Sequence, residues 1–122
     1  VVWPPGAYAD AFVQEMQRLT LATAAGVLLT PRSPQLVADV VTALREAGAE
    51  LLAGGDIARD AAGYAFQPTL LQVSGSRFLE APRALQNEAF GQVCLLVRTQ
   101  SQEQLQQVVH ALEGNLTGSI KF

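Results

Sequence analysis

The chain has 122 residues, of which 49% are hydrophobic and 16% are charged, and its formal net charge is −3. A chain of this length and composition forms one compact domain or part of one, so we predict a single domain over residues 1–122. The few basic residues are scattered, which argues against nucleic acid or an anionic membrane surface as a partner. No apolar run approaches the roughly 20 residues that a membrane-spanning helix needs.

The only cysteine, Cys94, has no partner for an internal disulfide. This favours a reducing compartment, and we expect the protein to be cytoplasmic. The sequence begins at Val1 without an initiator methionine and stops at Phe122, directly after a strand-like segment. We therefore expect both ends to have been set by truncation of a longer chain.

Two amphipathic helices are predicted in the first half of the chain. Apolar residues recur at spacings of three and four after Gly6 and should form the buried face of a first helix. They are Tyr8, Phe12, Met16 and Leu19. Ser33 followed by Pro34 is typical of an N-cap and a first helical position, and it predicts a second helix that ends at Gly48. Its apolar stripe consists of Leu36, Val37, Val40, Val41 and Leu44.

Three strands are predicted next. A short strand over residues 49–52 is followed by the loop 53–63 and by a strand over residues 66–73, whose Pro68 argues for an edge or irregular strand. Residues 93–97 read VCLLV and are continuously apolar. Such a run is expected of a central strand that is buried on both faces of a sheet.

The chain closes with a predicted helix and a predicted strand. The helix begins after Ser101, where Gln104 completes a capping box, and Gly114 ends it. Its apolar stripe consists of Leu105, Val108, Val109 and Leu112. A last strand is expected over residues 118–122. The order helix, helix, strand, strand, strand, helix, strand predicts an α/β fold in which a helix connects neighbouring strands.

Four segments of the chain carry motifs: GAELLAGG, GYAFQPTLL, NEAFGQVCLLV and GNLTGSI. In this order they resemble the closing part of the catalytic domain of aldehyde dehydrogenases. That family shows a Gly-Ala-strand-Gly-Gly segment, a Gly-aromatic-x-Pro-Thr segment, an E-x-F-G-P signature and a helix leading to a Gly-Leu-Thr-like turn. The resemblance covers residues 44–122 and is most specific at residues 68–70 and 88–91. It implies a fragment of that domain, with a largely parallel sheet flanked by helices.

Within the family, GNLTGSI and the stretch GVLLTPRSPQLVADVV are most similar to α-ketoglutaric semialdehyde and NADP-dependent fatty aldehyde dehydrogenases. The resemblance implies a parent enzyme, expected to be a homo-oligomer, that oxidises a small-molecule aldehyde to an acid through a cysteine-bound thiohemiacetal. NAD or NADP would be its cofactor. The nucleophile, the general base and the dinucleotide-binding half would lie in the remainder of the parent chain, so the isolated fragment should be inactive.

The E-x-F-G motif supplies two candidate cofactor-binding residues. Glu88 matches the glutamate that accepts hydrogen bonds from the nicotinamide ribose in the family, since a carboxylate offers two acceptor oxygens to two hydroxyls. Phe90 matches the phenylalanine beside the nicotinamide, where a flat apolar side chain limits ring movement and excludes water. Without the resemblance, the same residues also fit a solvated or capping glutamate and a core phenylalanine.

The residues that follow this motif set its backbone conformation. Gly91 is expected to permit a close turn before the strand. Gln92 departs from the family, which usually has proline at this position. Unlike proline, glutamine does not fix φ and has a backbone N–H. The orientation of Glu88 and Phe90 relative to the cofactor is therefore left open.

Three further residues resemble chemical groups that the family or a metal site would use. Cys94 stands in GQVC, similar to the G-Q-x-C of the catalytic cysteine, but its apolar run favours a small core residue over a nucleophile. Glu50 in ELLAGGD resembles the general-base segment, but two extra residues break the motif and favour surface charge. His110 lies off its helix stripe without Cys or carboxylate partners. We therefore predict no catalytic residue and no metal site in this chain.

Two other functions stay open. A non-catalytic α/β interaction module would share the aldehyde dehydrogenase fold. In such a module, residues 93–97 and the helices would have only a structural role. A family relative acting on acyl phosphates would also need a cysteine and would differ in its substrate alone. A glutamate motif and a G-Q-x-C cysteine encoded upstream of Val1 would favour the enzyme over the module.

Overall fold

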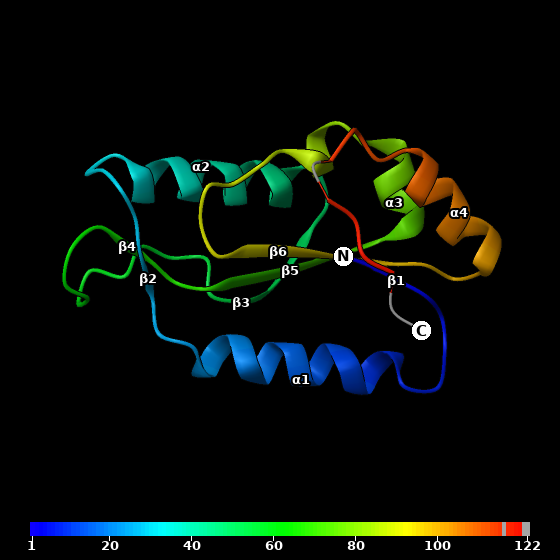
Figure 1. The fold of residues 1–122 in the computed structure, drawn as a ribbon, viewed down its shortest axis with the longest axis horizontal. Coiled ribbons are helices and arrows are strands. Elements are labelled where there is room, and N and C mark those ends of the chain that lie inside the picture. Colours follow the sequence, from blue (N-terminus) through cyan, green and yellow to red (C-terminus); the bar gives the residue numbers. More distant parts are fainter. Residues whose placement is uncertain (116, 121–122) are drawn as a thin grey trace.

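A four-stranded sheet forms the centre of the computed structural model, which describes residues 1–115 and 117–120 (Figure 1). Its strands lie in the order β1-β6-β5-β3. They are β1 (Val2–Trp3), β3 (Glu50–Ala53), β5 (Thr69–Ser74) and β6 (Val93–Arg98). Strand β6 is parallel to β1 and to β5, whereas β3 is antiparallel to β5. The sheet is therefore mainly parallel, and the α/β prediction is confirmed.

Helices cover both faces of this sheet (Figure 1). Helix α1 (Ala9–Ala22) lies alone on one face. The other side carries α2 (Ser33–Glu46), α3 (Gly75–Glu80), the 3₁₀ turn η1 (Ala84–Gln86) and α4 (Gln102–His110). None of the helices in the described part of the chain is long and apolar enough to span a membrane.

A second, two-stranded sheet lies beside the amino-terminal half of α2. It pairs β2 (Gly26–Val27) with β4 (Ala65–Phe66) in antiparallel orientation. The sequence analysis did not predict these strands. Each contains only two residues, too few for an alternating pattern to be visible.

Two apolar cores lie on the two faces of the four-stranded sheet. Alternate residues of β5 point to opposite faces, so Leu71 and Val73 enter the larger core while Leu70 enters the smaller one. The larger core packs these β5 residues against α2, α3 and α4. Its buried residues are Val37, Val41, Leu44, Ala49, Phe66, Leu71, Val73, Phe78, Leu85, Val97 and Val108. The smaller core buries Ala53, Leu70 and Leu96 and packs them against Phe12, Val13 and Met16 of α1.

The two predicted amino-terminal helices form, with corrections to their details. In α1, Phe12 and Met16 pack against the smaller core, but Tyr8 and Leu19 of the predicted face are exposed. In α2, Leu36 is likewise exposed, although the rest of the stripe faces the larger core. Ser33 is not an N-cap, because its hydroxyl interacts with Thr30 instead of the first helical turn.

The strand predicted over residues 66–73 is irregular, as one of the two alternatives had it, but the edge alternative is wrong. Strand β5 lies in the interior of the sheet between β6 and β3, and it begins only at Thr69. Pro68, which has no N–H to give to a ladder, lies in the break between β4, which ends at Phe66, and β5. The strand predicted over residues 49–52 is shifted by one residue to 50–53.

The carboxyl-terminal half confirms the central strand and the last helix. Strand β6 lies between two neighbours, and Leu96 and Val97 are buried, whereas the first half of the strand is partly exposed. Helix α4 is capped by Ser101, whose hydroxyl accepts from the Gln104 N–H at 3.0 Å. The Gln104 side chain accepts from Gln100 rather than from Ser101, so the capping box is incomplete.

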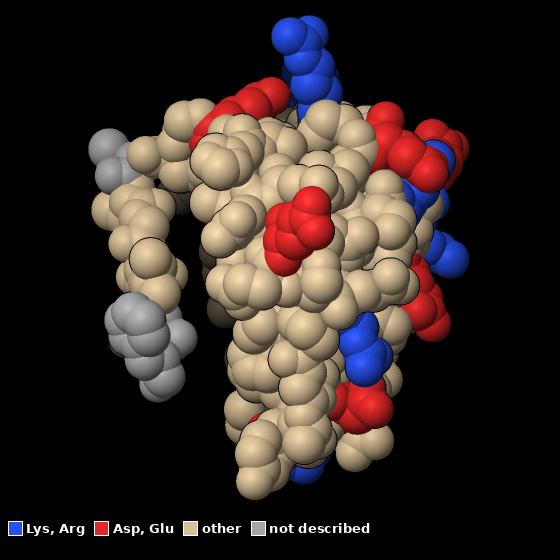
Figure 2. Space-filling model, turned by 90° about the vertical axis from the view of Figure 1, so that its right-hand side faces the viewer, with Lys and Arg blue, Asp and Glu red and all other residues tan. Residues whose placement is uncertain are grey.

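The predicted last strand is absent from the part that can be checked. Residues 118–120 are exposed and form no strand, and residues 121–122 lie outside the described residues. Strand β1, helix α3 and the turn η1 were not predicted. The end of the molecule that carries α3 and α4 shows acidic and basic side chains scattered among uncharged ones (Figure 2).

Candidate functional site

The glycine pair that ends GAELLAGG is hydrogen-bonded to the buried threonine of FQPT. Gly54 and Gly55 have φ values of 73° and 98°, a region that favours glycine. A Cβ atom on Gly54 would lie 2.0 Å from the carbonyl oxygen of Pro68, so no other residue fits there. The Gly55 N–H donates to the Thr69 hydroxyl at 2.9 Å, and this hydroxyl donates to the Gln67 carbonyl at 2.9 Å. The two motif segments therefore fold against each other.

Thr69 also joins this glycine pair to the strand that follows the E-x-F-G motif. Its backbone N–H donates to the Gln92 carbonyl at 2.8 Å, and Thr69 pairs with Val93 at the start of β6. Only 2% of Thr69 is exposed, and both its backbone N–H and its hydroxyl are used. Three of the four motif segments thus meet at one buried threonine.

The loop between η1 and β6 consists of two successive tight turns. The Gly91 N–H donates to the Ala89 carbonyl at 2.9 Å, and the Val93 N–H donates to the Gly91 carbonyl at 2.9 Å. Hydrogen bonds between residues two apart define γ-turns, here centred on Phe90 and Gln92. No non-glycine residue that the structure describes has a positive φ. Both turns are therefore of the inverse type, with a central φ of about −75°.

This loop presents its large side chains outward and its small ones inward. Ala89 packs against the larger core, and a Cβ atom on Gly91 would lie 3.1 Å from Cγ2 of Val37 in α2. By contrast, 81% of Phe90 is exposed, and Glu88 is exposed as well. Among the described residues, no hydrogen bond or ion pair involves the Glu88 carboxylate. The alternative of a core phenylalanine is therefore wrong for Phe90.

The structure brings Glu88 and Phe90 together on one surface loop rather than in a pocket. A hollow of about 490 Å³ lies between the end of α2 and β3, and one of about 440 Å³ lies between the start of α2 and the loop before β4. Neither is lined by Glu88 or Phe90. In this chain the two candidate residues stand on an exposed surface loop, outside both hollows.

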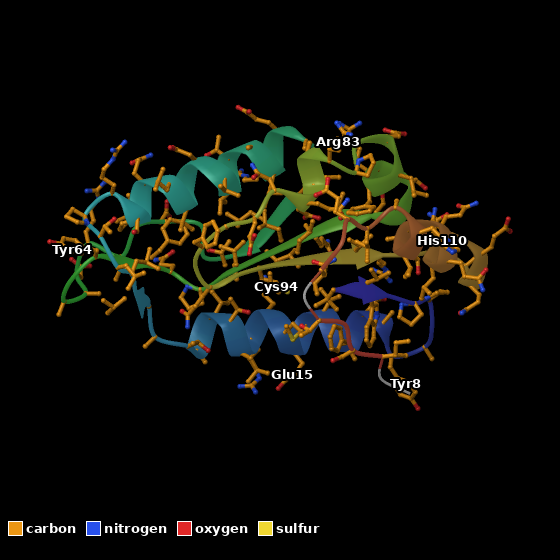
Figure 3. All side chains as sticks on the ribbon, turned by 45° about the horizontal axis from the view of Figure 1, so that its top comes forward. Tyr8, Glu15, Tyr64, Arg83, Cys94 and His110 are labelled. Carbon is orange, nitrogen blue, oxygen red and sulfur yellow. The ribbon has the colours of Figure 1, made fainter. Side chains whose placement is uncertain are left out.

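Cys94 lies on the opposite face of the sheet from α2. Its side chain packs with the smaller core, between β6 and α1 (Figure 3). It is a free thiol of intermediate exposure. Cys94 thus packs as the small apolar residue that its run predicts, although it is only partly buried.

Glu50 and His110 are both exposed, as the sequence predicts. Glu50 begins β3, where its carboxylate accepts a hydrogen bond from the Gln72 amide at 2.8 Å. His110 is the last residue of α4 and points to the surface (Figure 3). Across residues 1–115 and 117–120, no group of His, Cys, Asp and Glu is arranged to hold a metal ion.

One ion pair shifts the protonation of its members, and it lies far from the loop. On the outer face of α1, the hydrogen bond from Arg18 lowers the pKa of the Glu15 carboxyl below its ordinary value. The same bond, Nη2 to Oε1 at 2.6 Å, raises the pKa of Arg18. Both side chains are mostly exposed, so solvent screens the pair.

A family model described as the aldehyde dehydrogenase family matches residues 7–121. The chain belongs to the aldehyde dehydrogenase family. Protein MaoC of Klebsiella aerogenes is 35% identical over 95 residues, which make up 78% of this chain and 28% of that protein.

Solved aldehyde dehydrogenase structures share the fold. The NAD+ complex of an aldehyde dehydrogenase from Bacillus cereus has a TM-score of 0.67 at 19% identity, over 83% of this chain and 22% of that chain. PnpE from Pseudomonas sp. WBC-3 has a TM-score of 0.67 at 24% identity, with the same coverage of 83% and 22%. The chain thus spans less than a third of the length of these proteins.

The structure adds two residues that the sequence analysis did not single out. Thr69 was quoted as part of an aldehyde dehydrogenase motif, and a buried threonine beside a glycine pair could have indicated that the two segments touch. Gly26 lies under the side chain of Gln92. No signal in the sequence connects residues 26 and 92, because their contact depends on how the two sheets are placed.

Proposed function

We propose that this chain is the closing part of the catalytic domain of an NAD(P)-dependent aldehyde dehydrogenase, in which Glu88 and Phe90 hold the nicotinamide end of the cofactor. The single observation that supports this proposal is that one loop combines a fixed backbone with two exposed side chains. A carboxylate without a partner among the described residues and an exposed aromatic ring stand two residues apart, on a loop whose backbone is held by hydrogen bonds.

The residues present fit a nicotinamide riboside. The Glu88 carboxylate has two acceptor oxygens without a protein partner among the described residues, as two neighbouring ribose hydroxyls require. The exposed Phe90 ring offers a flat apolar surface to a flat ring and would exclude water beside it. When bound, NAD(P)+ supplies the hydride acceptor; the role of these two residues is to orient it.

The rest of the catalytic chemistry is assigned to the remainder of the longer chain. The Cys94 side chain packs against the smaller core, on the opposite face of the sheet from the core that Ala89 of the loop contacts, so the nucleophile would be another cysteine. Glu50 is engaged with Gln72 at the sheet edge, so the general base would also come from elsewhere. On this account the isolated fragment is inactive.

Cofactor and substrate class are the finer parts of the proposal. The NAD+ complexes of the Bacillus cereus enzyme and of PnpE support a nicotinamide dinucleotide, and NAD or NADP both fit the loop. The GNLTGSI segment supports α-ketoglutaric semialdehyde or a fatty aldehyde as substrate. We further propose a cytoplasmic homo-oligomer, since the one cysteine favours a reducing compartment.

The test is dinucleotide reduction by the full-length protein that contains this chain. NAD+ and NADP+ are each offered with α-ketoglutaric semialdehyde and with a long-chain aldehyde, and acid formation is followed in parallel. We expect turnover with one of the four combinations, and a loss of about tenfold or more in kcat/KM for Glu88→Gln, because a charged hydrogen-bond acceptor is lost. Absence of turnover with every aldehyde would favour the non-catalytic module instead.

A further inference from the structure

Gln92 lies where the Glu88 loop joins β6, and two of its groups make contacts there. Its carbonyl accepts from the buried Thr69 N–H at 2.8 Å. Its side chain lies over β2, where a Cβ atom on Gly26 would be 2.8 Å from Oε1 and 2.9 Å from Cδ of Gln92. Gln92 is an exposed residue, and the end of its side chain lies beside Gly26.

The backbone at Gln92 has the conformation that a proline would impose. Gln92 is the central residue of an inverse γ-turn, where φ is about −75°. Proline fixes φ at about −65°. The N–H of Gln92 forms no backbone hydrogen bond among the described residues, so a proline ring would remove none. A residue whose φ is free must be held in this turn by contacts.

We infer that Gln92 is a positioning residue for the cofactor loop. Its side chain on Gly26 and its carbonyl on Thr69 keep the second γ-turn closed, and the closed turn presents Phe90 and Glu88. This inference rests on the proposed function, because it assigns the loop to the dinucleotide. Gln92 itself does not touch the cofactor; its effect passes through the backbone of residues 88–91.

The test compares three variants of the full-length protein. Gln92→Gly removes the side-chain contact and frees φ, whereas Gln92→Pro removes the contact but fixes φ. Gln100→Gly is the matched control, an exposed glutamine that follows the other end of β6. Amide hydrogen exchange of Gly91 and Val93, the donors of the two turns, is measured without dinucleotide. The KM for the dinucleotide and kcat are then measured separately.

In Gln92→Gly we expect exchange at Gly91 and Val93 to be faster by about tenfold, since these amides report local opening. The KM for the dinucleotide should rise by about three- to tenfold with a smaller change in kcat, because a misplaced binding group weakens binding. Gln92→Pro should return both readouts to within about twofold of wild type. The control should change neither.

Unchanged exchange in Gln92→Gly would overturn the inference, because the turn would then close without this residue. Faster exchange with an unchanged KM would overturn it too, provided that Glu88→Gln raises the KM in the same assay. If Glu88→Gln and Phe90→Ala both leave the KM unchanged, the proposed function fails. A positioning role toward the cofactor then fails with it, whatever the exchange rates show.

Discussion

The start of β5 and the loop before β6 are neighbours with opposite character. At the start of β5, Thr69 is 2% exposed, and its N–H and hydroxyl are bonded within the chain. In the loop that this N–H contacts at the Gln92 carbonyl, Phe90 is 81% exposed, and the Glu88 carboxylate has no partner among the described residues. The polar groups of the first region are bonded within this chain, whereas the two side chains of the second are exposed, and under the proposed function they hold the dinucleotide.

The difference separates residues that stabilise the fold from residues that are free to bind. Buried contacts and backbone hydrogen bonds fix the backbone of the Glu88 loop. The side chains of Glu88 and Phe90 are exposed and can contact a ligand. Substitutions in the buried region should therefore change the free energy of unfolding. Substitutions at the tips should change dinucleotide binding with little effect on unfolding.

The largest effect is expected in the larger core. Phe78 of α3 is 1% exposed within the larger core, so Phe78→Ala should lower the free energy of unfolding by about 3–5 kcal/mol. Urea denaturation of the 122-residue chain measures this. Leu29→Ala is the control, since Leu29 is 97% exposed and should change stability by less than about 0.5 kcal/mol. Equal effects of the two variants would contradict the assignment of the core.

The next effect is expected at the start of β5. Thr69→Val keeps the shape but leaves the Gly55 N–H without its acceptor, so the free energy of unfolding should fall by about 1–3 kcal/mol. The KM for the dinucleotide in the full-length protein should stay close to wild type, because Thr69 is joined to the Glu88 loop by its backbone N–H, which valine retains. Thr69→Ser keeps the hydroxyl and should restore the free energy of unfolding. A Val variant with normal stability would show that this hydroxyl does not hold the glycine pair.

A smaller effect, confined to binding, is expected at the loop tip. Phe90→Ala should raise the KM for the dinucleotide by about three- to tenfold, as loss of an aromatic contact does. The free energy of unfolding should stay within about 0.5 kcal/mol of wild type, because the ring is exposed. Tyr64→Ala, at another exposed aromatic residue, serves as the control and should alter neither. A large loss of stability in Phe90→Ala would place the ring in the core after all.

The smallest effect is expected at the exposed ion pair on α1. Because Arg18 lowers the pKa of Glu15, the pair's contribution is present above the ordinary pKa of glutamate and is lost as pH falls through the lowered value. Arg18→Ala should return the Glu15 pKa toward its ordinary value in an NMR titration, with no measurable change in unfolding at neutral pH. A clear destabilisation at neutral pH would show that solvent does not screen this pair.

The parts of the fold that could be predicted are those with a local pattern. Helix α2 and strand β6 follow from periodic or continuous apolar residues, and α4 follows from its stripe and its Ser101 cap. Strands β1, β2 and β4 have two residues each and exist through partners far away in sequence, such as Val97 for Val2. Leu36 and Leu19 fit an apolar stripe yet are exposed. Periodicity predicts which face of a helix is apolar, but not how much of that face the neighbouring strands and helices cover.

The candidate site shows the same limit. Glu88 and Phe90 could be named from the motif, because motif residues are adjacent in sequence. The two γ-turns could not, since hydrogen bonds between residues two apart leave no compositional signal. Nor could the contact of Gln92 with Gly26, which depends on the placement of β2 beside the loop that precedes β6.

The most direct test of the central claim is equilibrium binding of NAD+ and NADP+ to the full-length protein with Glu88→Gln, compared with Glu50→Gln as a matched control. Both variants replace an exposed carboxylate by an amide. The account predicts that Glu88→Gln raises the Kd of the bound dinucleotide by about tenfold or more while Glu50→Gln leaves it unchanged. Equal dinucleotide affinity in wild type and Glu88→Gln would contradict the assignment of this loop to the cofactor.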